Sequence, residues 1–340
     1  MSDPPARRTQ TAARWLQAIG FAIGLMLLGW CVWLVASDQA RIEQLKRLAA
    51  SPGSLVALLA LSIALGLCNG MMFRAAPSAV LRLPVLDALA VNAVTTLLNN
   101  LPFKLSIVAR VYLHRTRNGV PVPLVLAWMA AALCIMVIGV VPPLAATVAL
   151  KRIDGLWWAV VVGGTVLLAA AAVIAGRLTR SPRFWAWVTV AGERRPATLG
   201  RLTRWPGFAQ LRQASDMVAS VPAVAQGVAW RSAAMGVGVW RFMVAAAAVG
   251  ATMTVGQCVV ADTVYFSIQT AAPTGALGAR EGGTVAAVAS LAGESLPVVV
   301  LAVTAAETAA NLLCAGAALL YLKLSTPPQQ AQSPPQQSRR

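Results

Sequence analysis

The strongest constraint on this chain is a series of apolar runs that are each long enough to cross a lipid bilayer. Crossing the hydrocarbon core as a helix takes about 20 apolar residues, and a helix closes its backbone hydrogen bonds within the segment. Such runs occupy residues 15–36, 54–73, 122–148, 156–176, 228–252 and 296–322. We therefore predict an all-α, polytopic membrane protein with about six full spans.

The charge distribution supports this prediction and orients the chain. Only 11% of the 340 residues are charged, whereas soluble domains contain about 25%. With both termini in the cytoplasm, 20 of the 28 Lys and Arg residues lie on the inner side and six on the outer side. This positive-inside bias predicts a bacterial-type inner membrane and accounts for the net charge of +17. Basic residues are not interleaved with aromatic ones, so we expect no nucleic-acid partner.

Two further apolar segments are interrupted by proline and charge. The first contains Asn99-Asn100-Leu101-Pro102-Phe103-Lys104 and then Arg110, and the second contains Pro273-Thr274-Gly275-Ala276-Leu277-Gly278-Ala279-Arg280-Glu281. Proline disfavours helix in the residue before it, so each segment splits into two arms that are too short to span comfortably. We predict re-entrant helical hairpins at about 86–113 and 255–294. Charged, broken helices at membrane depth are tolerated where they are buried in protein or line a wet cavity.

The two hairpins align with a constant offset, which places Pro102 against Pro273 and Arg110 against Glu281. Each lies between two spans, which defines repeat units at 54–148 and 228–322. Three crossings separate the first spans of the two units, so the units form an inverted repeat. If each hairpin instead crossed once, the repeats would be parallel.

The domain organisation follows from these segments. A cytoplasmic N-terminal segment (1–14) precedes a single transmembrane domain (15–322). Within that domain a cytoplasmic interfacial region (177–227) is rich in arginine and tryptophan, and residues 38–50 have the apolar spacing of a surface helix. The Pro- and Gln-rich tail (323–340) is expected to be disordered.

The interrupted segments resemble a known family. The residues Asn100-Leu101-Pro102-Phe103-Lys104, Arg110-x-Tyr112-Leu113 and the stretch from Pro273 to Gly282 are similar to the lysylphosphatidylglycerol synthase transmembrane family. The resemblance covers about residues 15–322, and its second motif is the more specific one. It implies a flippase-like domain that translocates lipid.

The chain departs from that family in two ways. The family's first motif commonly reads Pro-Gly-Arg-x-Gly-Glu, whereas this chain has Phe103, Lys104 and Ser106-Ile107 in place of Gly, Arg and Gly-Glu. No polar stretch is long enough to hold the aminoacyl-transferring domain. The resemblance therefore implies a stand-alone member, without lysyl transfer and without the acidic residue of the first motif.

Three basic residues of the hairpins are candidate ligands for a lipid phosphate. Lys104, Arg110 and Arg280 supply the ammonium and guanidinium groups that bind phosphate. Arg110 has an alternative role, which is to extend to the inner surface as an anchor beside other loop arginines. The sequence leaves both roles open.

The remaining candidate residues concern geometry and gating. Gly275 and Gly278 would let the chain turn and approach a headgroup, and Asn99 and Asn100 would bond carbonyls freed at the helix break. We expect Arg280 and Glu281 to point in different directions from a helix start. Glu281 would then pair with Arg110 near the pseudo-twofold axis, either as a gate or as a structural salt bridge.

Other buried charges are less constrained by the sequence. Glu307 in the last span lies at a depth similar to that of Arg241, so a contact between them is compatible with the sequence. Asp262 lies on the entering arm of the second hairpin. The five cysteines are widely spaced in apolar runs, and we expect neither a metal site nor a cofactor.

We expect this chain to bind and translocate an anionic phospholipid or a polyprenyl-linked lipid in a cleft between the hairpins. The alternative is an accessory subunit or enzyme of membrane lipid or envelope glycolipid biosynthesis that uses the same cleft, and a scaffold is a third class. Acid–base catalysis is disfavoured because no histidine lies near the cleft. A homo-oligomer or a partner from envelope biosynthesis is compatible with the sequence.

Overall fold

The computed structural model describes residues 22–101, 105–150, 152–194, 208–271, 277–292 and 296–325, and these ranges contain helices and no strand. The N-terminal segment and most of the C-terminal tail lie outside the described residues. So do four predicted site residues, namely Pro102, Lys104, Pro273 and Gly275.

Five helices in the described part of the chain are long and apolar enough to cross a membrane. They are α3 (Pro52–Ala75), α6 (Val122–Leu150), α7 (Gly155–Arg180), α11 (Val221–Val249) and α14 (Pro297–Leu324). Each overlaps one of the apolar runs of the sequence over most of its length. The predicted all-α, polytopic membrane fold is confirmed.

The first apolar run ends in a sharp bend. The helix Ala22–Ala36 meets α2 (Gln39–Ala49) at an angle of 95°, and the number of candidate spans rises from five to six if this bent pair is counted as one span. Asp38 lies at the corner and its carboxylate accepts a hydrogen bond from the Ala40 backbone N–H, which caps α2. The bend makes α2 a short helix of its own, within the residues 38–50 for which the apolar spacing predicts a surface helix.

Both interrupted segments form helical hairpins. The first consists of α4 (Val85–Leu98) and α5 (Leu105–Asn118), and the second of α12 (Val255–Ala271) and α13 (Ala279–Ala292). An arm of 14 to 17 residues rises about 21–26 Å, which is shorter than the hydrocarbon core of about 30 Å. The two arms of each hairpin pack against each other.

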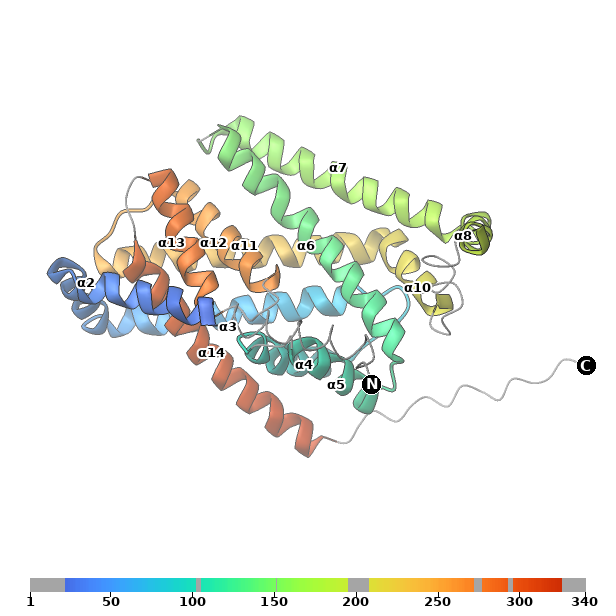
Figure 1. Ribbon diagram of the computed structural model, residues 1–340, viewed down its shortest axis with the longest axis horizontal. Helices are drawn as coiled ribbons and strands as arrows, with labels where there is room; N and C mark the ends of the chain where they lie inside the picture. The colour runs from blue at the N-terminus through green and yellow to red at the C-terminus, as the bar shows by residue number, and fades with distance from the viewer. Residues whose placement is uncertain are drawn as a thin grey trace, which may run out of the picture.

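The centre of the fold is the antiparallel pair of α3 and α11 (Figure 1). Arg231 in the first half of α11 bonds Asn69 in the last third of α3. At the other end, Gly250 just after α11 lies beside Arg47, which precedes α3. The long helices therefore run in opposite directions.

The packing around this pair is that of an inverted repeat. The α3 helix packs against the hairpin arm α4 of its own unit and against α14, the last span of the other unit. In the same way α11 packs against α12 of its own unit and against α6 of the other. Each hairpin is thereby enclosed by helices from both units.

A buried polar cluster holds the base of the first hairpin. Arg117 at the end of α5 donates from Nε to Asp87 Oδ1 in α4 at 2.8 Å, and it also donates to the carbonyl oxygen of Leu322 in α14. The Tyr321 hydroxyl donates to the same Asp87 oxygen at 3.1 Å. The open end of the hairpin is therefore attached to the end of the last span.

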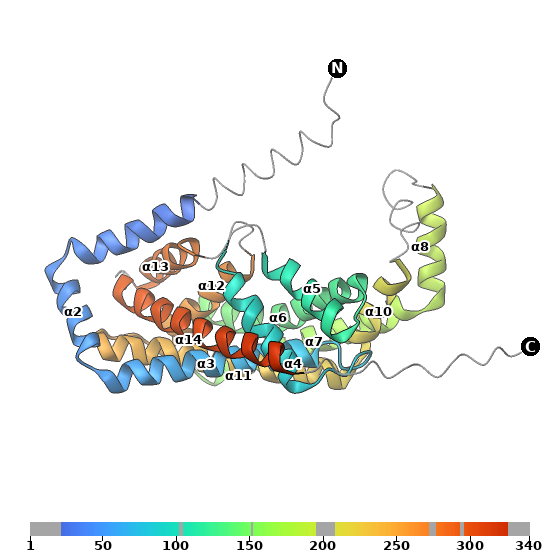
Figure 2. The same ribbon diagram turned by 90° about the horizontal axis from the view of Figure 1, so that it is seen from below.

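The remaining helices lie at the periphery. In Figure 1, α7 lies at the edge of the bundle, where it packs mainly on α6 and α10, and in Figure 2, α8 (Pro182–Arg194) and α2 lie at opposite ends of the molecule. The helix α10 (Phe208–Ala219) packs on α7 and α6. Gly176 permits this contact, because a Cβ there would lie 2.6 Å from the Ala219 backbone nitrogen.

Candidate functional site

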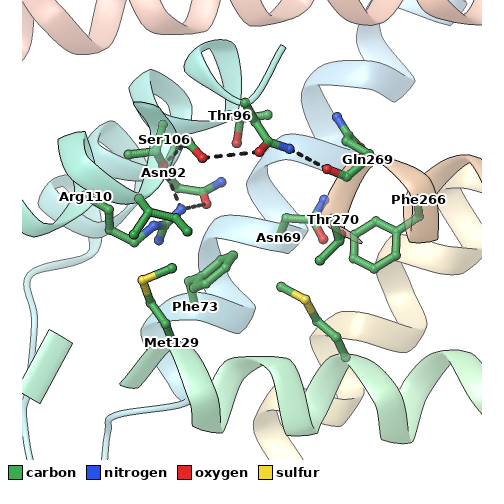
Figure 3. A pocket seen from close by; sticks show the side chains of 14 residues that line it. Asn69, Phe73, Asn92, Thr96, Ser106, Arg110, Met129, Phe266, Gln269 and Thr270 are labelled. Carbon is green, nitrogen blue, oxygen red and sulfur yellow. Dashed lines mark hydrogen bonds between the residues drawn. The ribbon is translucent and has the colours of Figure 1, made fainter. Parts of the chain in front are cut away.

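A cavity of about 170 Å³, lined by both polar and apolar side chains, lies where the first hairpin meets the end of α12 (Figure 3). Amide and hydroxyl side chains line it from four helices, among them Asn69 of α3, Asn92 of α4, Ser106 of α5, and Gln269 and Thr270 of α12. Such groups in apolar helices are costly to bury without partners, so a cavity lined by them is a candidate binding site.

Arg110 of α5 supplies the positive charge of this cavity. Its side chain is buried, and its Nη2 atom donates to Asn92 Oδ1 at 3.0 Å and to Thr95 Oγ1 at 2.7 Å. The guanidinium carbon lies 3.9 Å from the centre of the Phe73 ring. No carboxylate of the described residues lies within 4.0 Å of the guanidinium nitrogens, so only dipoles and an aromatic face compensate this charge.

The two hairpins are joined directly at this cavity. The Asn99 side chain, just after α4, donates from Nδ2 to the Gln269 carbonyl oxygen of α12 at 2.8 Å. Ser106 Oγ in turn donates to Asn99 Oδ1 at 3.2 Å. Asn99 therefore bonds a carbonyl near a helix break, as expected for its side chain, but the carbonyl belongs to the other hairpin.

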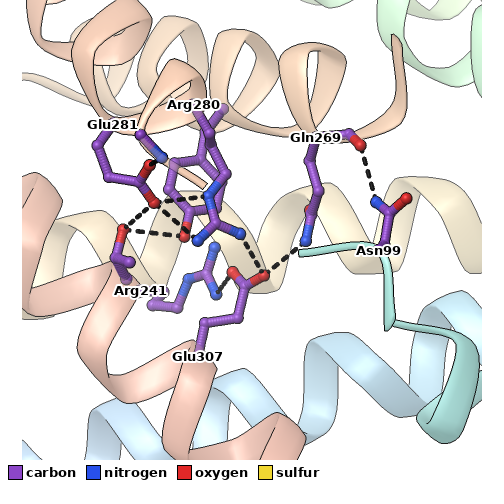
Figure 4. A network of polar contacts seen from close by, with 9 residues as sticks. Asn99, Arg241, Gln269, Arg280, Glu281 and Glu307 are labelled. Atoms are coloured by element: carbon purple, nitrogen blue, oxygen red, sulfur yellow. Dashed lines mark hydrogen bonds and ion pairs between the residues drawn. The ribbon is translucent and has the colours of Figure 1, made fainter. Parts of the chain in front are cut away.

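Next to the cavity lies a buried ionic network centred on Glu307 of α14 (Figure 4). Its carboxylate accepts hydrogen bonds from Arg241 Nη1 at 2.7 Å and from Arg280 Nη1 at 3.0 Å. Gln269 Nε2 donates to the same carboxylate at 2.8 Å. Since the backbone of Gln269 bonds Asn99, this residue links the network to the cavity and to the first hairpin.

The start of α13 completes the network. Arg280 donates from Nε and Nη2 to Glu281 Oε1 at 3.0 and 2.8 Å, and Thr304 Oγ1 donates to the same oxygen at 3.0 Å. The other Glu281 oxygen accepts from the Gly278 backbone N–H. Arg280 also lies 4.3 Å from the centre of the Tyr265 ring. Both members of the Arg280–Glu281 pair are fully buried.

Gly278 has a geometric role in the turn before α13. Its φ of 82° is left-handed, a conformation that side chains with a Cβ rarely adopt. A Cβ at this position would overlap the carbonyl group of Gly24 in the helix Ala22–Ala36. The glycine therefore allows the second hairpin to turn directly against the first span.

Two predictions about these charges are wrong. Arg110 and Glu281 do not pair. The Arg110 guanidinium contacts Asn92 of α4 and the Phe73 ring. The Glu281 carboxylate instead accepts hydrogen bonds from Arg280, Thr304 and Gly278. Arg280 and Glu281 do not point apart, because the long arginine side chain folds back onto its neighbour. Arg280 consequently has no free face for a headgroup in this conformation. The contact between Arg241 and Glu307 is confirmed.

The predicted residues therefore separate into two groups. Arg110 and Asn99 line the cavity, whereas Gly278, Arg280 and Glu281 belong to the buried network next to it. Asn100 lies in the turn after α4, and its Oδ1 atom is buried without a hydrogen-bond partner.

The buried charged side chains show an excess of one cation among the described residues. Four buried arginines face three buried acids once the Asp87–Arg117 pair at the hairpin base is set aside. The cations are Arg110, Arg231, Arg241 and Arg280, and the anions are Asp262, Glu281 and Glu307. The interior is therefore one negative charge short of neutrality, and the cavity at Arg110 has room for that charge.

Sequence reasoning missed several residues of the cavity. Polar residues recur at helical spacing along and just after α4, at Asn92, Thr95 or Thr96, and Asn99. This polar stripe in an apolar helix is a signal that could have identified the face of α4 that lines the cavity. Asn69 and Gln269 are single polar residues in apolar helices, and no local pattern indicates that they lie side by side.

No protein-family model, curated protein or solved structure matches this chain.

Proposed function

We propose that this membrane protein binds the anionic headgroup of a lipid in the cavity at Arg110 and moves it between the two leaflets. The observation that carries the proposal is the buried Arg110 guanidinium, which faces the cavity and has no carboxylate partner in the described structure. A phosphate would supply the missing negative charge through charge-assisted hydrogen bonds.

The surface of α5 favours a lipid over a soluble anion as the ligand. Ser106 and Arg110 face the cavity, whereas Leu105, Val108 and Tyr112 on another face of the same helix are exposed. In a membrane this exposed apolar face contacts hydrocarbon. Acyl chains could therefore stay in the bilayer along α5 while the headgroup reaches the cavity.

Translocation fits the inverted repeat and the resemblance to the lysylphosphatidylglycerol synthase transmembrane family. Alternating access in repeat-based transporters comes from movement of one unit against the other around a site near the repeat interface. Here the cavity lies at the contact between the hairpins of the two units, which the Asn99–Gln269 hydrogen bond holds together. We propose an inner-membrane location with both termini in the cytoplasm, as the positive-inside bias indicates.

The test is lipid translocation in proteoliposomes that contain fluorescent phosphatidic acid, phosphatidylglycerol or phosphatidylcholine. Dithionite bleaching of the outer leaflet then reports the rate of exchange between leaflets. We expect the protein to accelerate exchange of the two anionic lipids, and Arg110→Gln to slow it at least tenfold. A hydrogen bond to a charged group contributes about 1.5–3 kcal/mol, which corresponds to a factor of ten or more.

Arg115→Gln is the matched control, because Arg115 lies on the same helix but is exposed. It should leave the rate unchanged. Arg110→Gln retains groups that can bond Asn92 and Thr95 and strands no carboxylate, so the variant should fold. Equal exchange in wild-type, Arg110→Gln and empty vesicles would refute the proposed function.

A further inference from the structure

The second hairpin contains a buried acid with no ion-pair partner. The Asp262 side chain of α12 is 2% exposed, and its Oδ2 atom has no hydrogen-bond partner. No arginine or lysine nitrogen of the described chain lies within 4.0 Å of its carboxylate. An ionised carboxylate in such a place is costly to keep, so this group requires an explanation.

The carboxyl group occupies a notch in α11. A Cβ at Gly238 would overlap the carboxyl atoms of Asp262, so the glycine is what makes room for the acid. Arg231 and Arg241 flank Gly238 along α11, but their guanidinium groups are directed elsewhere. Arg231 lies 3.6 Å from the centre of the Phe266 ring, and Arg241 bonds Glu307.

The charged and titratable groups around Asp262 come from several helices. Arg231 and Arg241 of α11 attract its negative charge, and Glu307 of α14 repels it. The Cys258 thiol precedes it by one turn on the same helix, α12. Arg280 and Glu281 of α13 are already paired with each other, and α6, which also packs on α12, has no charged residue. Both flanking arginines have buried guanidinium nitrogens without partners.

We propose that Asp262 is a proton-binding carboxyl group that takes up a proton when an anion occupies the neighbouring cavity. The link is Arg231, whose two contacts, Asn69 and Phe266, both line that cavity. An anion beside these residues cancels part of the positive potential that favours ionised Asp262. Two unit charges about 10 Å apart at an effective dielectric constant of about 20 interact strongly enough to change a proton affinity by about tenfold, which sets the scale expected for this coupling.

The coupling rests on the proposed function, whereas the proton site itself does not. Anion and proton would bind with positive cooperativity, and each would raise the affinity for the other by the same factor. One monovalent lipid anion and one proton together carry no net charge across the membrane. The proposal thus assigns a coupling role to Asp262.

Infrared difference spectroscopy tests the proton site without any transport. On acidification of the purified wild-type protein we expect the carbonyl stretch of a buried carboxylic acid, and we expect Asp262→Asn to lack it. Glu43→Gln, which removes an exposed acid on α2, should retain it. The same band should appear at higher pH when phosphatidic acid is added. If the spectrum of Asp262→Asn is identical to that of the wild type at every pH, the proposal is overturned. Asp262 would then be a permanently ionised carboxylate that is bridged by water.

The transport arm separates this inference from the proposed function. In proteoliposomes with the potential clamped by valinomycin and potassium, a gradient of one pH unit should shift the leaflet ratio of fluorescent phosphatidylglycerol by about tenfold. Asp262→Asn should exchange the lipid with no response to the gradient. If the wild-type protein exchanges lipid at a leaflet ratio that does not respond to the gradient, the coupling is refuted and the proposed function is retained. If the wild-type protein exchanges no lipid, the proposed function is refuted. The infrared band then still decides whether Asp262 binds a proton.

Discussion

Glu307→Gln is the most informative perturbation of the buried network, because one carboxylate there serves two arginines. Glu307 pairs with Arg241 at 2.7 Å and with Arg280 at 3.0 Å, and both guanidinium groups are fully buried. Glutamine preserves the shape and can still accept one hydrogen bond, but it removes the negative charge. Glu281 is then left as the only carboxylate for two cations within this network.

The expected loss of stability follows from that count. Removing one partner of a buried ion pair typically costs about 3–5 kcal/mol, because the remaining charge is desolvated and uncompensated. The glutamine oxygen keeps part of the hydrogen bonding, so we expect about 3 kcal/mol. The measurement is the free energy of unfolding by sodium dodecyl sulfate in mixed micelles, followed by circular dichroism. Glu43→Gln, which breaks the exposed pair with Lys46, should leave this free energy unchanged.

A double variant tests the charge argument itself. Arg241→Gln combined with Glu307→Gln removes one cation with the anion and leaves the Arg280–Glu281 pair balanced. It should unfold at a higher free energy than Glu307→Gln alone, by about 1 kcal/mol or more. A Glu307→Gln protein as stable as the wild type, or a double variant whose loss equals the sum of the two single losses, would refute the reasoning.

Two further substitutions test how the hairpins are held. Gly278→Ala should destabilise the protein by more than about 1–2 kcal/mol in the same assay, because the left-handed φ of 82° is costly for alanine and the added Cβ would overlap the helix Ala22–Ala36. Gly29→Ala is the control and should not destabilise the protein, because nothing lies within 4 Å of a Cβ at that position. Asp87→Asn should lower the free energy of unfolding by about 3 kcal/mol, because it removes the carboxylate that pairs with Arg117, and it should raise the rate of amide hydrogen exchange in α4 and α5. Tyr321→Phe loses one hydrogen bond to Asp87 and should lower the free energy of unfolding by about 1 kcal/mol. Wild-type exchange rates in Asp87→Asn would contradict the role of this cluster.

The cavity shows where reasoning from the sequence was sufficient and where it failed. Arg110 could be singled out because a charge in an interrupted apolar segment needs a compensating environment. Its partners could not be found in this way, since Asn92 and Thr95 lie on the other arm of the hairpin and Phe73 lies on α3. Gln269, which joins the cavity to the ionic network, gave no local signal.

The choice of ion pairs was decided by side-chain reach. The aligned repeats suggested that Arg110 meets Glu281, because corresponding positions of an inverted repeat can approach a common axis. In the fold, Arg280 folds back onto Glu281 and also reaches Glu307, which lies 27 residues away along the chain. Glu281 therefore pairs with Arg280, its neighbour in the chain, and Arg110 faces the cavity instead.

The amino-acid sequence by itself determined the apolar spans and the hairpin breaks, and it left open whether the two units are inverted or parallel. Those features depend on segment length, on proline and on the distribution of charge, which are local properties. Only the tertiary structure decided which polar groups share a cavity and which neutralise one another. Contacts such as Asn99 with Gln269 join residues 170 positions apart, and they depend on how the antiparallel α3 and α11 bring the two hairpins together.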